Sequence, residues 1–198
     1  QTARGMSPTH AGLMSIAMVG GLFVSSIVSG RIITATGRWK RYLVGGMVLV
    51  VIGLALLGTI DESTNLAVIG FFMALLGIGM GATMQNLVLA VQNNVAMSEM
   101  GAASAVVAFF RSMGGSIGVS ALGAVLSHQV ASKVTDGLHT IGVSTNSHDS
   151  HSIPDLRTLP GPVRAVFESS FGQSFGEIFL IAAPFALIAL LCVSLIKE

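Results

Sequence analysis

The stretch Gly101–Gly123, GAASAVVAFFRSMGGSIGVSALG, decides the fold class of this chain. Between Glu99 and Lys133, Arg111 is the one residue of the Asp, Glu, Lys and Arg types. The apolar run is long enough for a transmembrane helix, which needs about 17–25 mainly apolar residues. If a helix begins near Gly101, Arg111 lies about 15 Å along it at ~1.5 Å per residue, near the middle of a hydrocarbon core roughly 30 Å thick.

A charge at that depth needs a reason. A cation at the centre of a membrane helix costs at least ~2.5–3.5 kcal/mol unless it meets a partner or water. A helical wheel at about 100° per residue places Arg111 on a face of mostly small residues. That face comprises Ser104, Val107, Ala108, Gly114, Gly115 and Gly118, and Val106, Phe109, Met113 and Ile117 lie opposite. We expect Arg111 to be either a structural arginine paired with carbonyls or a carboxylate, or a residue of a transport pathway.

The composition is that of an integral membrane protein. Of 198 residues, 52% are apolar and 10% are charged, whereas a soluble domain averages about 25% charged residues. The basic residues gather in one short loop, so no nucleic-acid partner is expected. Cys192, the one cysteine, offers neither a disulfide framework nor a thiolate metal cage. The chain begins at Gln1 rather than Met, and we expect a fragment of a longer protein.

Five segments are long and apolar enough to cross a bilayer. They cover about 8–30, 42–60, 66–93, 102–130 and 175–196, and an outer loop covers about 135–173. Helix is the expected class because backbone polar groups in lipid must bond within their own segment. The sequence therefore predicts an all-α polytopic transmembrane helix bundle. The second and fifth segments are apolar all round, so we expect them at the outside of the bundle.

The loop between the first two segments sets the orientation. Residues 31–41 contain Arg31, Arg38, Lys40 and Arg41. The positive-inside rule makes this loop cytoplasmic. Counting crossings from it places the loop 135–173 outside and the C-terminus inside.

The third segment carries a polar stripe. Gln85 and Gln92 are seven residues apart and share one helix face, and Asn86 and Asn93 form a second stripe about 100° away. These amides can face water and substrate, or they can form hydrogen bonds between helices. We favour the pathway for Gln85 and the helix contact for Asn93, and we keep Gln85, Gln92, Asn86 and Arg111 as candidate pathway residues.

Two pairs of glycines follow the GxxxG spacing: Gly77 with Gly81, and Gly114 with Gly118. Small residues at this spacing allow helices to approach closely, and we expect both pairs to serve packing within the chain.

The chain lacks the motifs of a catalytic or metal site. The sequence has no Walker loop, no GxSxG and no HExxH, so no enzyme activity, catalytic residue or cofactor is expected. His148, Asp149 and His151 cluster in the outer loop. Their spacing matches no closed zinc site, and we favour a solvated loop over a metal site.

Three stretches resemble one family, the fourteen-span drug:proton antiporters of the major facilitator superfamily. Residues 7–13, SPTHAGL, resemble the SPxxAGL entry to a span, and residues 30–38, GRIITATGR, resemble the loop signature GxxxDRxGR. Thr34 and Ala35 stand where that signature has Asp and Arg. The third stretch comprises residues 90–93, 101–104 and 110–118, and it is similar to the AvQn…GxASa…ffRxxGgxiG run of these transporters.

The resemblance implies the last five spans of a C-terminal six-helix half, with the N-terminal half of the same chain as a missing partner. It implies export of small hydrophobic or cationic drugs from the cell membrane, driven by a proton gradient, with Gly30, Gly37 and Arg38 in a gating loop. In that fold the third span lines the central cavity. The alternatives are a same-fold exporter of a metabolite or siderophore, and a non-transporting truncated fragment.

Overall fold

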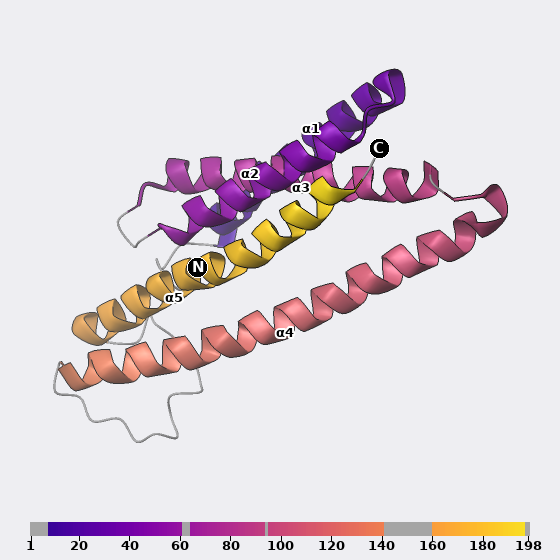
Figure 1. Ribbon diagram of the computed structural model, residues 1–198. Helices are drawn as coiled ribbons and strands as arrows, with labels where there is room; N and C mark the ends of the chain where they lie inside the picture. The colour runs from indigo at the N-terminus through magenta and orange to yellow at the C-terminus, as the bar shows by residue number, and fades with distance from the viewer. Residues whose placement is uncertain (1–7, 61–63, 94, 141–159, 197–198) are drawn as a thin grey trace.

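The computed structural model describes residues 8–60, 64–93, 95–140 and 160–196 (Figure 1). Its elements are helices throughout the described residues: α1 (Pro8–Thr36), α2 (Lys40–Gly58), α3 (Leu66–Asn93), the short 3-10 turn η2 (Met97–Glu99), α4 (Met100–Thr140) and α5 (Gly161–Leu195). In that part of the chain, five helices are long and apolar enough to cross a membrane. The predicted all-α fold is therefore confirmed. His148, Asp149 and His151 lie outside the described residues.

Helix α3 is the centre of the packing, and glycines on opposite sides of it admit two neighbours. A Cβ atom on Gly77 or Gly81 would collide with the carbonyl oxygens of Met18 or Leu22 in α1. Gly79, two residues after Gly77, faces α2 instead, and a Cβ atom there would lie 2.7 Å from the Gly46 oxygen. Because residues two apart on a helix point in nearly opposite directions, the sequence GIG at 77–79 lets α3 contact α1 and α2 backbone to backbone.

Helix α2 is more enclosed than its sequence predicts. It contacts both α3 and α5, and Leu43, Gly46, Met47, Gly53 and Leu57 are buried along it. The expectation that α2 lies at the outside holds for part of its surface, since Val48 and Ile52 are exposed. Hydropathy alone does not reveal the buried side, because an interior face and a lipid-facing side are both apolar.

The basic loop is a tight connection. Gly37 has φ +70°, and its N–H donates to the Ile33 oxygen at 2.7 Å. This is the left-handed cap that glycine supplies at a helix end. Trp39 then folds back into a buried cluster with Ile33, Leu43 and Ala90, so the loop is anchored on α3.

Helices α4 and α5 are longer than the predicted spans. At ~1.5 Å per residue, the 41 residues of α4 measure about 60 Å, roughly twice the hydrocarbon thickness. Their distal parts run side by side at the end of the molecule where α4 stops and α5 begins (Figure 1). Lys133 Nζ donates to Glu177 Oε1 at 2.7 Å, and Val134, Leu138 and Phe171 are buried there. Much of the predicted outer loop, 135–140 and 161–173, is therefore helical.

Candidate functional site

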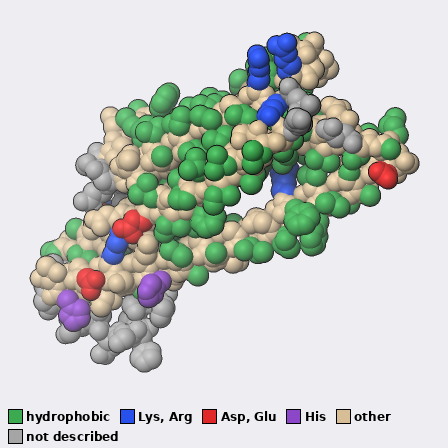
Figure 2. Space-filling model, in the orientation of Figure 1, with side chains coloured by type: hydrophobic (Ala, Val, Ile, Leu, Met, Phe, Trp, Pro, Cys, Tyr) green, Lys and Arg blue, Asp and Glu red, His purple; other side chains and the backbone are tan. Residues whose placement is uncertain are grey.

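The second half of α3 and the first half of α4 enclose an apolar groove. We call these two halves, which meet at η2, the inner halves; in α4 the inner half comprises residues 100–119. The chain turns back between them through η2, and Gln92 Nε2 donates to Ser104 Oγ at 3.4 Å across the junction. Beyond this contact the two helices diverge, and Figure 2 shows a hollow between α4 and the other helices. The groove has a volume of about 450 Å³. Its lining comprises Thr83, Met84, Leu87, Val88 and Val91 from α3, and Val106, Val107, Phe110 and Arg111 from α4.

Arg111 is the charged member of this lining. Its side chain is exposed, and it makes no ion pair or hydrogen bond within the described part of the chain. The cation therefore lies among aliphatic and aromatic side chains. The Thr83 hydroxyl donates to the Gly79 oxygen at 2.8 Å and lies beside Gly46 of α2.

The register of the two helices relates the predicted residues to one another. Seven residues make nearly two helical turns. Gln85 therefore lies two turns farther from η2 than Gln92 on the same side of α3, and Arg111 lies two turns farther from η2 than Ser104 on the same side of α4. Because the helices are antiparallel and Gln92 meets Ser104, Gln85 and Arg111 are at the same level of the groove. Gln85 is exposed. It lies beside the lining residue Met84 and is not itself part of the lining.

Asn86 lies in a different environment from Gln85. It is 0% exposed, and its Nδ2 donates to the Ala82 oxygen one turn earlier in α3. Its Oδ1 is buried and has no hydrogen-bond partner in the described residues. The structure therefore separates Asn86 from the groove. Of the predicted pathway residues, Arg111 lines the groove, and Gln92 joins α3 to Ser104 of α4. Asn93, the fourth amide, is exposed at the end of α3.

The predicted gating-loop residues have distinct positions. Gly37 forms the turn described above. Its positive φ explains why glycine stands at this position of the motif. Arg38 follows it and is exposed. Gly30 lies within α1, where an added Cβ would meet nothing within 4 Å, so the described residues give no packing reason for glycine at that position.

Sequence reasoning missed the apolar walls of the groove. Thr83, Leu87, Val91 and Phe110 carry no polar pattern that marks them, and they become a site only through the angle between α3 and α4. The available signal was the spacing of Met84, Leu87, Val88 and Val91, which places them on one face of α3. No group of three or more His, Cys, Asp or Glu side chains that could hold a metal ion occurs in the described residues.

Comparisons with known proteins identify the family of this chain. Residues 1–119 match the family model described as the Major Facilitator Superfamily. An uncharacterized MFS-type transporter of Mycobacterium tuberculosis is 30% identical over 194 residues, which are 98% of this chain and 28% of that protein. The multidrug transporter protein MdtP of Bacillus subtilis is 34% identical over 134 residues, 68% of this chain and 25% of that protein.

A tetracycline resistance determinant of Streptomyces rimosus is 30% identical over 140 residues, 71% of this chain and 40% of that protein. The chain thus spans between 25% and 40% of the length of these three relatives. The family match covers more than half of the chain and coincides with the apolar helices α1 to α3 and the inner half of α4. This chain belongs to the Major Facilitator Superfamily of multi-pass membrane transporters.

Proposed function

We propose that this chain is the C-terminal part of a proton-driven multidrug exporter that works by alternating access. The observation that carries the proposal is Arg111, a cation without a protein partner in the described residues, on the wall of an apolar groove between two membrane helices. An ionisable residue inside a membrane span is costly and is characteristic of transport pathways. The names of the Bacillus and Streptomyces relatives support drugs and antibiotics as cargo.

In this proposal, the chain forms five spans of the C-terminal six-helix half of a fourteen-span protein. The loop 31–41 and the C-terminus are cytoplasmic, in accordance with the positive-inside rule, and the protein resides in the cell membrane. Substrates are small hydrophobic or cationic drugs, which reach the groove between α3 and α4. Arg111 supplies the charged contact in the lining, and Gln85 and Gln92 supply polar groups beside the groove. Asn86, which is buried, acts by fixing α3. The protein performs no chemical conversion of its cargo.

Alternating access requires that the groove be open to one side of the membrane at a time, through rocking of two helical halves about a site near the midplane. In this proposal the first half of α4 takes part in that movement, and Gln92 of α3 contacts Ser104 of α4 close to η2. The gating loop with Gly30, Gly37 and Arg38 connects α1 to α2 at the same end of the bundle.

The experiment uses the full-length transporter in cells that lack their own exporters. We expect Arg111→Ala to lower resistance to several drugs while the protein still inserts at its normal level. Arg111→Lys should recover part of the activity, because an ammonium group keeps the charge but lacks the planar guanidinium fork. Arg164→Ala, an arginine paired with Glu168 outside the groove, is the control and should export normally. Normal export by Arg111→Ala would contradict the proposal.

A further inference from the structure

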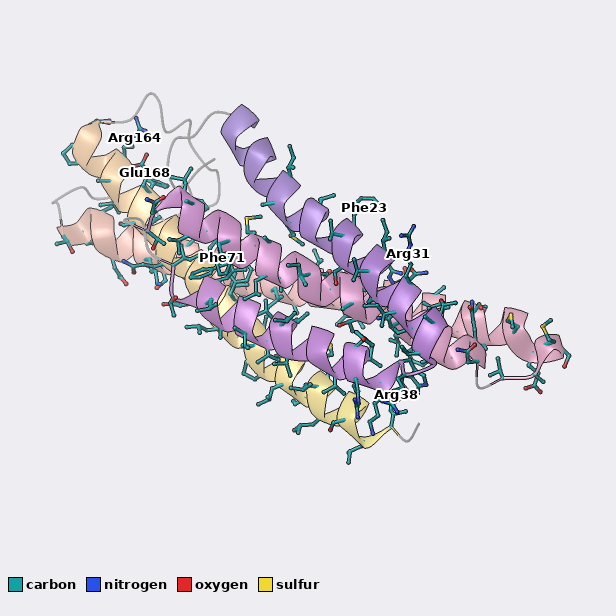
Figure 3. All side chains as sticks on the ribbon, turned by 90° about the horizontal axis from the view of Figure 1, so that it is seen from above. Phe23, Arg31, Arg38, Phe71, Arg164 and Glu168 are labelled. Atoms are coloured by element: carbon teal, nitrogen blue, oxygen red, sulfur yellow. The ribbon has the colours of Figure 1, made fainter. Side chains whose placement is uncertain are left out.

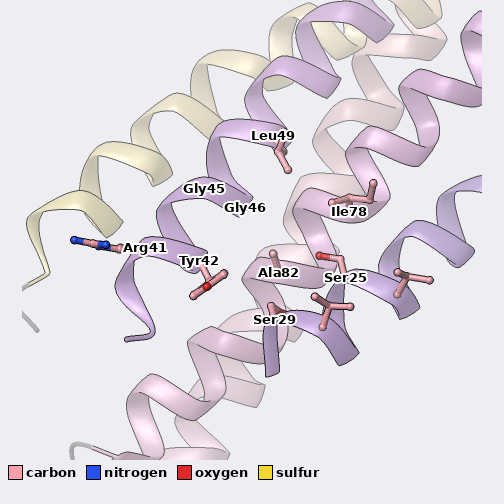
Figure 4. A pocket seen from close by; sticks show the side chains of 11 residues that line it. Ser25, Ser29, Arg41, Tyr42, Gly45, Gly46, Leu49, Ile78 and Ala82 are labelled. Carbon is pink, nitrogen blue, oxygen red and sulfur yellow. The ribbon is translucent and has the colours of Figure 1, made fainter. Parts of the chain in front are cut away.

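A second cavity lies between α1 and α2, where both helices pass over α3 (Figure 4). Its volume is about 420 Å³, within the range of about 300–1,000 Å³ typical of small-molecule pockets. Val24, Val28, Leu49 and Ile78 give it apolar walls, and Tyr42 lies at one end. Val24 and Val28 are 63% and 50% exposed, so the cavity is open at the side of the bundle.

The charge at one end of this cavity is strongly positive. Tyr42 and Arg41 belong to the first turn of α2, directly after the basic loop. Arg31 follows Val28 by three residues, which places it on the same side of α1 and one turn closer to that loop. Figure 2 shows Lys and Arg side chains gathered at this end of the molecule. Glu99, the acidic residue at the inner ends of the described helices, belongs to η2 between α3 and α4 instead.

Apolar walls below a basic rim match one class of membrane molecule. An acyl chain fits a groove that faces the hydrocarbon, and a phosphate fits arginines at the interface. Basic pockets between membrane helices on the cytoplasmic side bind anionic lipid headgroups in this way. We propose that the α1–α2 cavity binds an anionic phospholipid, with its acyl chain along Val24, Val28 and Leu49 and its phosphate between Arg31 and Arg41. This inference does not depend on what the protein transports.

The two arginines can reach such a phosphate without disturbing the fold. Both side chains are exposed. Figure 4 shows the Arg41 side chain extending from the rim away from the centre of the cavity, and exposed side chains change rotamer within nanoseconds. Gly45, which lines the cavity, has nothing within 4 Å of an added Cβ. The first atom of a larger side chain at Gly45 therefore meets open space, and a ring there should occupy part of the cavity.

The test is native mass spectrometry of the detergent-solubilised full-length transporter mixed with dioleoyl-phosphatidylglycerol or dioleoyl-phosphatidylcholine. We expect the anionic lipid to bind more tightly. We expect Arg31→Gln and Arg41→Gln to weaken its binding by roughly fivefold each, which corresponds to the ~1 kcal/mol per basic side chain near an anionic surface. Gly45→Phe should remove the bound lipid. Thermal unfolding of each variant checks that the fold is kept.

Two controls make the result specific. Arg38→Gln removes a charge from the same loop; Arg38 is absent from the cavity lining, and in Figure 3 it lies well apart from Arg31. Gly20→Phe adds the same bulk at an open position of α1 outside the lining. Both should bind lipid normally.

Three outcomes would overturn the proposal. They are equal binding of the two lipids, an unchanged preference in the variant that lacks both arginines, and displacement of phosphatidylglycerol by an equal concentration of inorganic phosphate. The last would reduce the site to a simple anion site. If Gly45→Phe fails to fold, the arginine variants decide alone.

Discussion

The contact of α1 with α3 and the inner half of α4 contain similar residues but pack in opposite ways. Gly77 and Gly81 bring α3 against the backbone of α1. Gly114 and Gly118 have the same spacing, yet an added Cβ at either would meet nothing within 4 Å in the described residues. The buried residues of α4 are Val134 and Leu138, both in its distal part. Within the described residues, one GxxxG pair therefore lies at a close helix contact and the other does not.

The difference separates two roles within one bundle. Helices α1, α2 and α3 form a unit with close backbone contacts, which resists changes in volume. The first half of α4 contributes Val106, Val107, Phe110 and Arg111 to the groove, and Gly114 and Gly118 lie in open space within the described residues. The following experiments compare closely packed positions with open ones.

The largest difference is expected between Asn86 and Gln85, which are neighbours in sequence. Asn86→Asp would place a carboxylate at a fully buried position, next to the Ala82 oxygen that now accepts a hydrogen bond. Burial of an unpaired charge costs several kcal/mol. We expect a large loss of folded protein, measured by thermal unfolding in detergent.

Gln85→Glu is the control for this change, because Gln85 is exposed beside the groove. It should leave the unfolding temperature nearly unchanged. Equal losses in the two variants would remove the distinction between a packed and an open side of α3.

An intermediate effect is expected for the two glycine pairs. Gly81→Ala would push a methyl group against the Leu22 oxygen of α1, and overpacking of this kind costs about 1–3 kcal/mol. Gly118→Ala has open space and should stabilise α4 by about 0.5–1 kcal/mol, since alanine is the better helix former. Thermal unfolding of both variants measures whether the unfolding temperature falls for Gly81→Ala and rises for Gly118→Ala. A destabilising Gly118→Ala would mean that the inner half of α4 is already packed.

The smallest effect is expected at the distal contact of α4 with α5. Glu177→Gln removes the ion pair with Lys133. The Lys133 side chain is 27% exposed and the Glu177 side chain is 45% exposed. Exposed ion pairs contribute about 0–1 kcal/mol. The variant should unfold only slightly earlier, and the difference should shrink at high salt. A loss that is large and independent of salt would show that packing, not charge, is what the substitution disturbed.

The sequence predicts the helices better than their contacts. Apolar length predicted a segment over about 66–93, and helix α3 covers Leu66–Asn93. Apolar length underestimated α4 and α5, since residues 135–140 and 161–173 are too polar to read as membrane segments and yet remain helical beyond them. Hydropathy identifies where a helix meets lipid, not where it stops.

The candidate site was predictable only in its polar members. Arg111 and Gln85 are conspicuous in apolar helices, whereas Leu87 and Phe110 become groove residues through the divergence of α3 from α4. Asn86 and Gln85 have similar side chains, and a rotation of about 100° around the helix separates the buried amide from the exposed one. That distinction depends on where α1 and α2 lie, which no local pattern encodes.

Cysteine labelling in the full-length transporter tests whether the groove between α3 and α4 is the water-accessible substrate path that we propose. The background variant is Cys192→Ser, because Cys192 is exposed. Leu87→Cys places a thiol in the groove lining, and Ile188→Cys places one on the apolar face of α5, where Ile188 is 57% exposed. We predict that a hydrophilic maleimide labels Leu87→Cys and that a transported drug slows the labelling, while Ile188→Cys stays unlabelled. Equal and slow labelling at both positions, unaffected by any drug, would contradict the account.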